Sequence, residues 1–305
     1  MPKPLPILVL LTSFVSPVVM AATCSCAGVP LLGTMESSSP QKGKWYFGTT
    51  VETHEIDKLV RGSDTVHDET GRDRSSQSLV AEVSYGFNEK WSASALVSRI
   101  SHERQIGANS RVKASGIGDG IVVVKYSPWR AGLFSRNGLS VGVGAKIAIG
   151  EDDEKQNQIV LAEDMQPSTG ANSLILWAHG NHTFNQSGRT EGYLGTSYTR
   201  NSDNDRDYQF GDEFTITIGA SHRLESRWGF NGSLKYRKTE RDQRNSVDIP
   251  NTGGEWLDFV PAVQYHFTDN LAARLSGRIP VWRDLNDQLQ FTTSYAYSLA
   301  VSYVM

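Results

Sequence analysis

The sequence predicts an all-β fold, namely an antiparallel transmembrane β-barrel of about twelve strands with periplasmic N- and C-termini. Three observations carry this prediction: a long alternating stretch at the end of the chain, similar stretches before it, and connections that alternate between short and long. Charged residues make up 21% of the 305 residues and the mean hydropathy is -0.38, which excludes a bundle of membrane helices.

The stretch Leu289–Met305 shows the alternation most clearly. Its odd positions carry mainly large apolar or aromatic side chains, and its even positions carry small, mostly polar ones. Side chains alternate between the two faces of a strand, so this stretch predicts a strand between two different solvents. Tilted strands of about 9–11 residues span a bilayer, and aromatic residues favour its interfaces. We therefore expect a closing barrel strand with its odd positions facing lipid.

Eleven earlier stretches repeat this pattern. The cleanest alternates Leu, Val, Ala and Ile with Ser, Gly and Lys. The predicted strands cover residues 44–54, 79–87, 91–97, 116–126, 139–149, 172–184, 190–200, 210–224, 228–236, 257–267 and 273–279.

The predicted connections alternate in length. Short turns are expected at 88–90, 185–189, 225–227 and 268–270, and long loops at 57–76, 101–115, 150–168 and 238–254. The turn 127–137 is longer than the others on its side. An even strand count with short turns at one end is typical of outer-membrane barrels, whose short turns face the periplasm. Twelve strands leave room for a narrow channel, between a side-chain-filled small barrel and a wide porin.

The N-terminus predicts export. Lys3 precedes the apolar run Leu5–Met20, and small residues at Val19 and Ala21 fit a signal-peptidase site. We expect a signal peptide at 1–21, a periplasmic Cys-containing leader and linker at 22–41, and an outer-membrane barrel of a Gram-negative bacterium at 42–305. Outer-membrane lipid and lipopolysaccharide are its expected surroundings. The formal net charge of -3 offers no basic footprint for nucleic acid, which is not an expected partner.

The two cysteines, Cys24 and Cys26, follow the predicted cleavage site directly. Adjacent-but-one thiols can bind a soft metal such as copper or zinc, and this is the one cofactor that the sequence suggests. Lipidation of Cys24 is a second interpretation, although Thr23 fits a lipobox poorly. The third is an exposed pair in an unstructured leader, oxidised or partner-bound in the periplasm.

Charged residues on the inward positions of the predicted strands are the candidate lumen residues. One interpretation is a salt-bridged, partly plugged interior, because buried charges need partners. The other is a constriction that selects small-molecule solutes by charge and hydrogen bonding. The candidates are Glu52, Glu82, Asp119, Lys125, Lys146, Glu191, Glu213, Lys235, Arg274 and Arg278.

The acidic run Glu151–Glu154 and the scattered histidines are weaker candidates. The run could bind divalent cations at the lipopolysaccharide surface or form an ordinary solvated loop. His179 and His182 are three residues apart on a predicted strand and so face opposite sides, which disfavours a chelating pair.

Two prolines fall in predicted strands. Pro261 occupies an outward position, and Pro280 lies on the neighbouring strand. Proline cannot complete a ladder bond, and a closed barrel has no edge, so we expect a bulge or kink at Pro261. Such a bulge would set curvature or open a lateral gap at Pro261 and Pro280 through which an apolar solute leaves the lumen.

Five short motifs occur in one order along the chain. They are Gly118-Asp119, Gln166-Pro167-Ser168-Thr169-Gly170, Gly211-Asp212-Glu213-Phe214, Thr252-Gly253-Gly254 before Pro261-Ala262-Val263-Gln264-Tyr265, and Ile279-Pro280-Val281-Trp282. With these motifs the chain resembles, over about residues 42–305, the outer-membrane proteins described as MetA-pathway phenol-degradation or transporter-like. The resemblance implies an outer-membrane barrel that takes up small, often aromatic, compounds, and it implies no catalytic residues. The chain ends in Met305 where outer-membrane proteins usually end in Phe, which bears on its signal to the barrel-assembly machinery.

Three functions follow from these observations. The first is a porin-like channel or transporter for small, hydrophobic or aromatic solutes by passive diffusion. The second is a plugged structural or binding barrel whose CxC leader docks a periplasmic metal or redox partner. The third is an outer-membrane enzyme, which is disfavoured because the sequence shows no nucleophile elbow, phosphate loop or HExxH motif. Ser221 and His222 are adjacent and face opposite sides, so we predict that the protein is not an enzyme.

Overall fold

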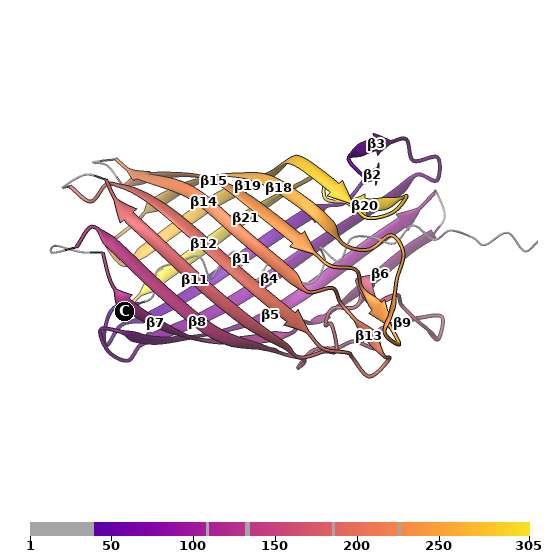
Figure 1. Cartoon of the computed structure of the whole chain (residues 1–305), viewed down its shortest axis with the longest axis horizontal. Coiled ribbons are helices and arrows are strands. Elements are labelled where there is room, and N and C mark those ends of the chain that lie inside the picture. Colours follow the sequence, from indigo (N-terminus) through magenta and orange to yellow (C-terminus); the bar gives the residue numbers. More distant parts are fainter. Residues whose placement is uncertain (1–39, 108–109, 132–134, 185–186, 225–226) are drawn as a thin grey trace, which may run out of the picture.

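A computed structural model describes residues 40–107, 110–131, 135–184, 187–224 and 227–305. These residues form a closed antiparallel barrel of twelve tilted strands, when β6 and β7 are counted as one interrupted strand (Figure 1). The all-β prediction and its strand number are confirmed. The predicted signal peptide, Cys24 and Cys26 lie outside the described residues. No helix in the described part of the chain is long and apolar enough to cross a membrane.

Neighbouring barrel strands follow one another in the sequence, and the pairing of β4 with β5 and of β1 with β21 closes the ring. The barrel strands are β1 (Trp45–Glu55), β4 (Arg72–Gly86), β5 (Trp91–Ile106), β6 (Ser110–Ile117), β7 (Gly120–Trp129), β8 (Asn137–Ile147), β11 (Ser173–Thr183), β12 (Thr190–Asn201), β14 (Glu213–Arg223), β15 (Trp228–Thr239), β18 (Gly254–His266), β19 (Leu271–Leu285) and β21 (Tyr295–Val304).

Short elements lie beyond the long-loop end of the barrel (Figure 1). They belong to three small sheets and one helical turn. These are β2 (Lys58–Arg61), β3 (Asp64–Val66) and β20 (Gln290–Thr292); β9 (Lys155–Gln156) and β10 (Ile159–Val160); β13 (Tyr208–Gln209), β16 (Gln243–Arg244) and β17 (Val247–Asp248); and the 3-10 helix η2 (Glu163–Met165).

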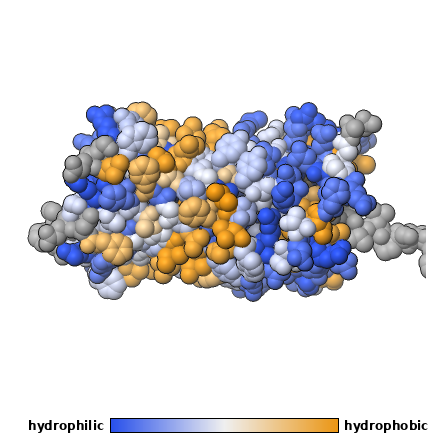
Figure 2. All heavy atoms as spheres, turned by 90° about the horizontal axis from the view of Figure 1, so that it is seen from above, coloured by the Kyte–Doolittle hydropathy of each residue, from blue (hydrophilic) through white to orange (hydrophobic). Residues whose placement is uncertain are grey.

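The outer surface is apolar over the barrel and polar at the long-loop end. Figure 2 shows apolar residues gathered over the barrel wall and hydrophilic ones around the loops. On β21 the outward Leu299 is 53% exposed, whereas Ser298 beside it lines the interior. Outward aromatic pairs such as Trp45–Tyr85 lie near the short-turn end, with ring centroids 4.6 Å apart. This arrangement matches a lipid-facing belt with an interfacial aromatic girdle.

The two ends of the barrel chain meet at the short-turn end. The amide of Trp45 donates to the carbonyl of Met305, and the amide of Met305 donates to the carbonyl of Trp45, each at 2.9 Å. In outer-membrane barrels this end faces the periplasm, so the long loops form the extracellular mouth.

The stretch 289–305 is not one strand, contrary to the prediction. β21 begins at Tyr295, and the preceding β20 leaves the barrel to pair with β2. Phe291 is buried against Ile56 and Leu59 in a small apolar cluster above the wall. Side chains alternate with a period of two both in this small sheet and in a strand that faces lipid. The alternation alone therefore could not show that the stretch is divided between the two.

Two predicted loops are largely strand. Within 57–76 and 101–115, β4 starts at Arg72, β5 runs to Ile106 and β6 begins at Ser110. Their residues are polar because the strands continue beyond the membrane into water, where an outward side chain need not be apolar. The sequence signal therefore ended at the membrane boundary and not at the end of the strand.

The ladder between β18 and β19 is irregular beside Pro261. A register shift leaves Val281 as an extra residue on β19, directly after Pro280. The β18–β19 pairs then step over Pro261 and its preceding neighbour, while on the other side Pro261 pairs regularly with Gly232 of β15. The bulge thus falls at Pro280, and β18 continues as a strand through Pro261.

Candidate functional site: the lumen and its extracellular mouth

The barrel interior contains a cavity of about 240 Å³ in its middle. Strands β1, β14, β15, β18, β19 and β21 supply its wall. Four predicted lumen residues meet here: Glu52, Lys235, Arg274 and Arg278. Hydroxyl groups surround them, from Thr50, Thr217, Ser233, Ser276, Ser298 and Ser302. The site is therefore polar and more basic than acidic.

Glu52 is fully engaged inside this cavity. Its Oε1 lies 2.8 Å from Nε2 of His54 and accepts a hydrogen bond of 3.3 Å from Arg278. The guanidinium of Arg278 also lies 3.9 Å from a carboxylate oxygen of Asp258. Arg278 thus joins two carboxylates of different strands, which balances part of their buried negative charge.

A second cavity of about 440 Å³ continues toward the short-turn end. It shares Gln264 and Arg274 with the first cavity, so the two spaces adjoin. Glu191, another predicted lumen residue, lines it together with Arg189 and Arg223. The two cavities together form a polar path that extends from the middle of the barrel toward its short-turn end along one wall.

The opposite wall is closed by side chains. Asp119 and Lys146 lie 3.4 Å apart, and the hydroxyl of Thr169 accepts from Lys146 at 2.8 Å and donates to Asp119 at 2.6 Å. Lys125 interacts electrostatically with Glu82 and lies 4.8 Å from the centre of the Trp177 ring. A buried apolar cluster packs on the same wall: Val80, Leu96, Ile121, Val123 and Ile175. These four predicted lumen charges are structural partners and do not line the open path.

Glu213, the tenth predicted lumen residue, lies near the extracellular end of β14. Its carboxylate pairs with Arg237 of β15 at 3.4 Å. The side chain of Arg237 in turn covers the ring of Trp256, with 4.0 Å between guanidinium and ring centre. This charge therefore belongs to the wall of the mouth.

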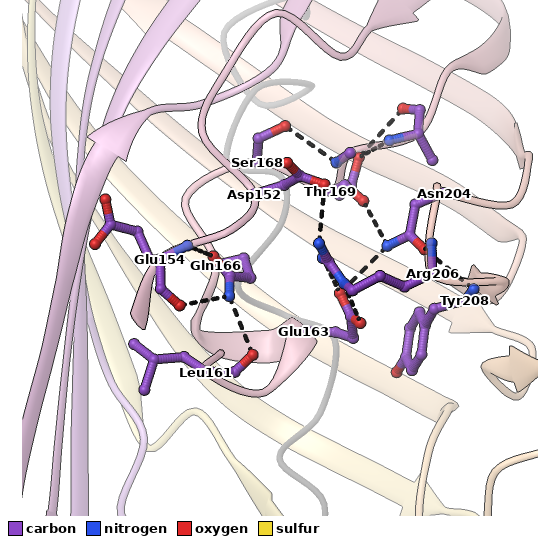
Figure 3. A network of polar contacts seen from close by, with 12 residues as sticks. Asp152, Glu154, Leu161, Glu163, Gln166, Ser168, Thr169, Asn204, Arg206 and Tyr208 are labelled. Carbon is purple, nitrogen blue, oxygen red and sulfur yellow. Dashed lines mark hydrogen bonds and ion pairs between the residues drawn. The ribbon is translucent and has the colours of Figure 1, made fainter. Parts of the chain in front are cut away.

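The loop between β8 and β11 folds over the extracellular mouth. Met165 of η2 is completely buried, and Asp164 accepts from Arg74 of β4 at 2.7 Å. Figure 3 shows Arg206 reaching from the β12–β14 loop between two carboxylates, Glu163 at 2.6 Å and Asp152 at 3.2 Å. The loop is thus fastened to opposite sides of the barrel by ion pairs.

Asp242 joins the β15–β18 loop to the β12–β14 loop at the extracellular end. Its carboxylate accepts from the hydroxyl of Tyr208 at 2.6 Å and from the amide of Gly211 at 2.8 Å, and its own amide donates to Thr252 at 3.0 Å. Burial raises the pKa of Asp242 to about 6, and burial beside Asp242 raises the pKa of Tyr208. This carboxyl is therefore more readily protonated than an exposed one.

Sequence reasoning missed most of the mouth. Its ion pairs join loops that are far apart in the sequence, so no local pattern marks them. One signal was present: the motif 166–170 carries Gln166, whose amide group bonds three backbone groups, and Thr169, which holds Asp119. Gly170 ends the motif with φ of 66°, in a conformation that favours glycine.

The acidic run Glu151–Glu154 is partly used inside the protein. Glu151 accepts from the amide of Ile117 at 3.2 Å, and Asp152 pairs with Arg206. Within the described ranges, no group of three or more His, Cys, Asp or Glu side chains is placed to hold a metal ion.

The closed twelve-stranded barrel, its apolar belt and its polar interior define an outer-membrane-type β-barrel. The chain belongs to the family described as "Putative MetA-pathway of phenol degradation", whose model matches residues 96–299. This confirms the resemblance seen in the sequence.

Solved structures share the fold at low sequence identity. An outer membrane channel from Pseudomonas putida F1 is similar with a TM-score of 0.71 and 10% identity, covering 88% of this chain and 97% of that one. The beta domain of the Bordetella autotransporter Brka is similar with a TM-score of 0.53 and 9% identity, covering 87% and 100%. A search of curated protein sequences found no significant match.

Proposed function

We propose that this barrel is an outer-membrane channel through which small solutes, including hydrophobic or aromatic ones, diffuse passively. The observation that supports it most directly is the pair of adjoining cavities along one wall of the lumen. The family's description, which refers to phenol degradation, favours aromatic solutes. The similar Pseudomonas putida protein is itself an outer membrane channel.

We also propose that the protein is exported and inserted into the outer membrane. Residues 1–21 are removed on export, residues 22–41 remain as a periplasmic leader, and the barrel-assembly machinery inserts residues 42–305 beneath the lipopolysaccharide. The exposed apolar belt supports contact with lipid. No enzymatic role is proposed, because the exposed ring of His222 is bonded to the hydroxyl of Thr190 at 2.9 Å and not to the neighbouring Ser221 in the described structure.

Planar-bilayer conductance tests the channel. The folded protein should conduct ions, and Glu163→Gln should raise the conductance because it breaks the ion pairs of Glu163 with Arg206 and Arg244 and leaves Arg206 held by Asp152 alone. The matched control is Glu255→Gln, which breaks an exposed ion pair of 3.0 Å with Lys238 on the outer surface. Absence of conductance in the wild type and in Glu163→Gln would contradict the proposal.

A plugged structural or binding barrel is the second candidate. The ion-paired mouth and the side-chain-filled wall favour it. In this case Cys24 and Cys26 of the leader would dock a periplasmic soft metal or redox partner. Metal analysis of the exported protein and of Cys24→Ser/Cys26→Ser tests it: equal metal content would leave the cysteines without this role.

A further inference from the structure

Two cations that face the middle cavity have no partner within hydrogen-bond or ion-pair distance in the described part of the chain. Among the residues that the structure describes, Lys235 and Arg274 make no hydrogen bond or ion pair, although both are only partly exposed. Two other cations of the interior do form ion pairs, Lys146 with Asp119 and Arg278 with Glu52. Lys235 interacts with Glu52 electrostatically at longer range, but Glu52 is shared with His54 and Arg278. One shared carboxylate leaves the partly buried cations incompletely balanced, and such a site is suited to an incoming anion.

The two cavities carry an excess of positive charge, which also favours an anion. The middle cavity is lined by three basic residues and one carboxylate, Glu52, which is already bonded to His54 and Arg278. The second cavity is lined by three arginines, Arg189, Arg223 and the shared Arg274, and by one carboxylate, Glu191. The whole chain has a formal net charge of -3, so the excess of positive charge is local to this path. Low-dielectric walls focus such a field and concentrate anions within it.

The remaining lining indicates what kind of anion fits. Ser276 and Ser298, with hydroxyl oxygens 2.6 Å apart, offer donors beside Arg274, and an arginine fork matches a carboxylate. Val260, Ala296 and Ala300 give the same cavity an apolar part. At about 240 Å³ the cavity lies below the roughly 300–1,000 Å³ of sites for drug-sized ligands, so a small molecule is required.

We propose that Lys235 and Arg274 form a binding subsite for a small organic carboxylate inside the lumen. The carboxylate lies between the two cations, and its apolar part lies against Val260 and the alanines. Arg274 then passes the anion to the second cavity, which it also lines. This subsite deepens the proposed channel function by naming a solute class, and its occupancy can be measured whether or not the barrel conducts.

Equilibrium dialysis of the folded protein in detergent tests the subsite, with benzoate as the probe and neutral benzamide as its isostere. Wild-type protein should bind benzoate and bind benzamide at least about tenfold more weakly, the loss expected for one charge-assisted hydrogen bond. Lys235→Gln and Arg274→Gln should each weaken benzoate binding by a similar factor, and Arg274→Lys should retain most of it. Lys238→Gln is the control, since Lys238 is exposed on the same strand and pairs with Glu255 outside.

Reversal potentials across a KCl gradient give the second readout. The wild type should pass chloride in preference to potassium, and the double variant Lys235→Gln/Arg274→Gln should lose that preference while Lys238→Gln keeps it. Inorganic phosphate in the dialysis separates a general anion site from an organic one, and binding of phosphate as tight as that of benzoate would overturn the carboxylate assignment. Equal binding of benzoate and benzamide, or unchanged binding in both single variants, overturns the subsite even if the channel conducts. Loss of conductance with benzoate binding intact contradicts the channel alone.

Discussion

At the residue scale, neighbouring positions of one strand experience different solvents. Leu299 points outward at mid-barrel, between Val51 and Leu275 on the adjacent strands. Ser298 points inward and its hydroxyl contacts that of Ser276. A cation costs about 2–4 kcal/mol at the lipid-facing midplane of a barrel. Leu299→Arg should therefore lower the free energy of unfolding by about 2–4 kcal/mol, and Ser298→Arg by much less.

Urea unfolding in lipid vesicles, followed by the heat-modifiable mobility of the folded barrel, measures both variants. Equal losses at 298 and 299 would contradict the assignment of the two faces. The comparison is internal, because both changes introduce the same side chain at adjacent positions of β21.

The alternation of residues predicted which side chains face the lumen, but it could not predict which charged side chains pair with each other. Asp119 and Lys146 both belonged to the predicted lumen, yet the hydroxyl that joins them comes from Thr169 in a loop. Lys125 is turned toward Trp177, a contact between strands that do not neighbour each other. Alternation determines which face a residue occupies, whereas pairing depends on strand tilt and loop path, which leave no local pattern.

At the element scale, the seam between β18 and β19 is the irregular part of the wall. The pairs step over Pro261, and Val281 bulges on the opposite strand. Tyr297 is 50% exposed and points outward, and its ladder partner Gly277 lies on the same face. Both residues nevertheless line the middle cavity. Gly277 pairs with Tyr297 of β21 on one side and lies next to the ring of Pro261 on the other, without a side chain to cover the wall there. This seam is therefore where a lateral gap would form.

Replacing Pro261 tests whether the seam lets solutes pass. Pro261→Ala restores a backbone donor and should regularise the ladder. If an apolar solute leaves the lumen here, its uptake into cells should slow while ion conductance in bilayers stays unchanged. Unchanged uptake would show that the irregularity serves curvature alone, as bulges commonly do. Pro250→Ala, in an extracellular loop, controls for the loss of a proline.

At the scale of the whole molecule, the barrel could be predicted from the sequence, but the cap could not. The cap is the set of extracellular loops at 56–71, 148–172, 202–212, 240–253 and 286–294. The belt requires an apolar outer face over every strand, and closure requires an even, sequential order of antiparallel strands, so both leave a repeated signal. The cap is built by loops whose polar residues resemble solvated ones until the structure brings Arg74 to Asp164 and Arg206 to Glu163. Strand ends beyond the membrane were hidden for the same reason, because water does not select apolar side chains.

The cap should also respond to pH through Asp242, which ties the β12–β14 loop to the β15–β18 loop. Its pKa is raised from the ordinary 3.8 to about 6, mainly by burial. The folded cap therefore holds this proton more tightly than an unfolded loop does, and its stability is greatest below pH about 4 and falls as pH rises to about 6. At 1.36 kcal/mol per pKa unit, the loss is about 3 kcal/mol in total.

Amide hydrogen exchange of residues 240–253, corrected for intrinsic rates, measures this change. Protection should fall by up to about a hundredfold between pH about 4 and pH about 7, since about 3 kcal/mol corresponds to that factor. Asp242→Asn cannot ionise but keeps an oxygen for Tyr208 or Gly211, so it should hold the loops at every pH and remove the dependence. The membrane-spanning strands of the same sample are the internal reference, because a change confined to the cap separates loop opening from barrel unfolding. Constant protection in the wild type, or an equal pH dependence in Asp242→Asn, would mean that Asp242 does not control the cap and that its ion pairs alone keep the mouth closed.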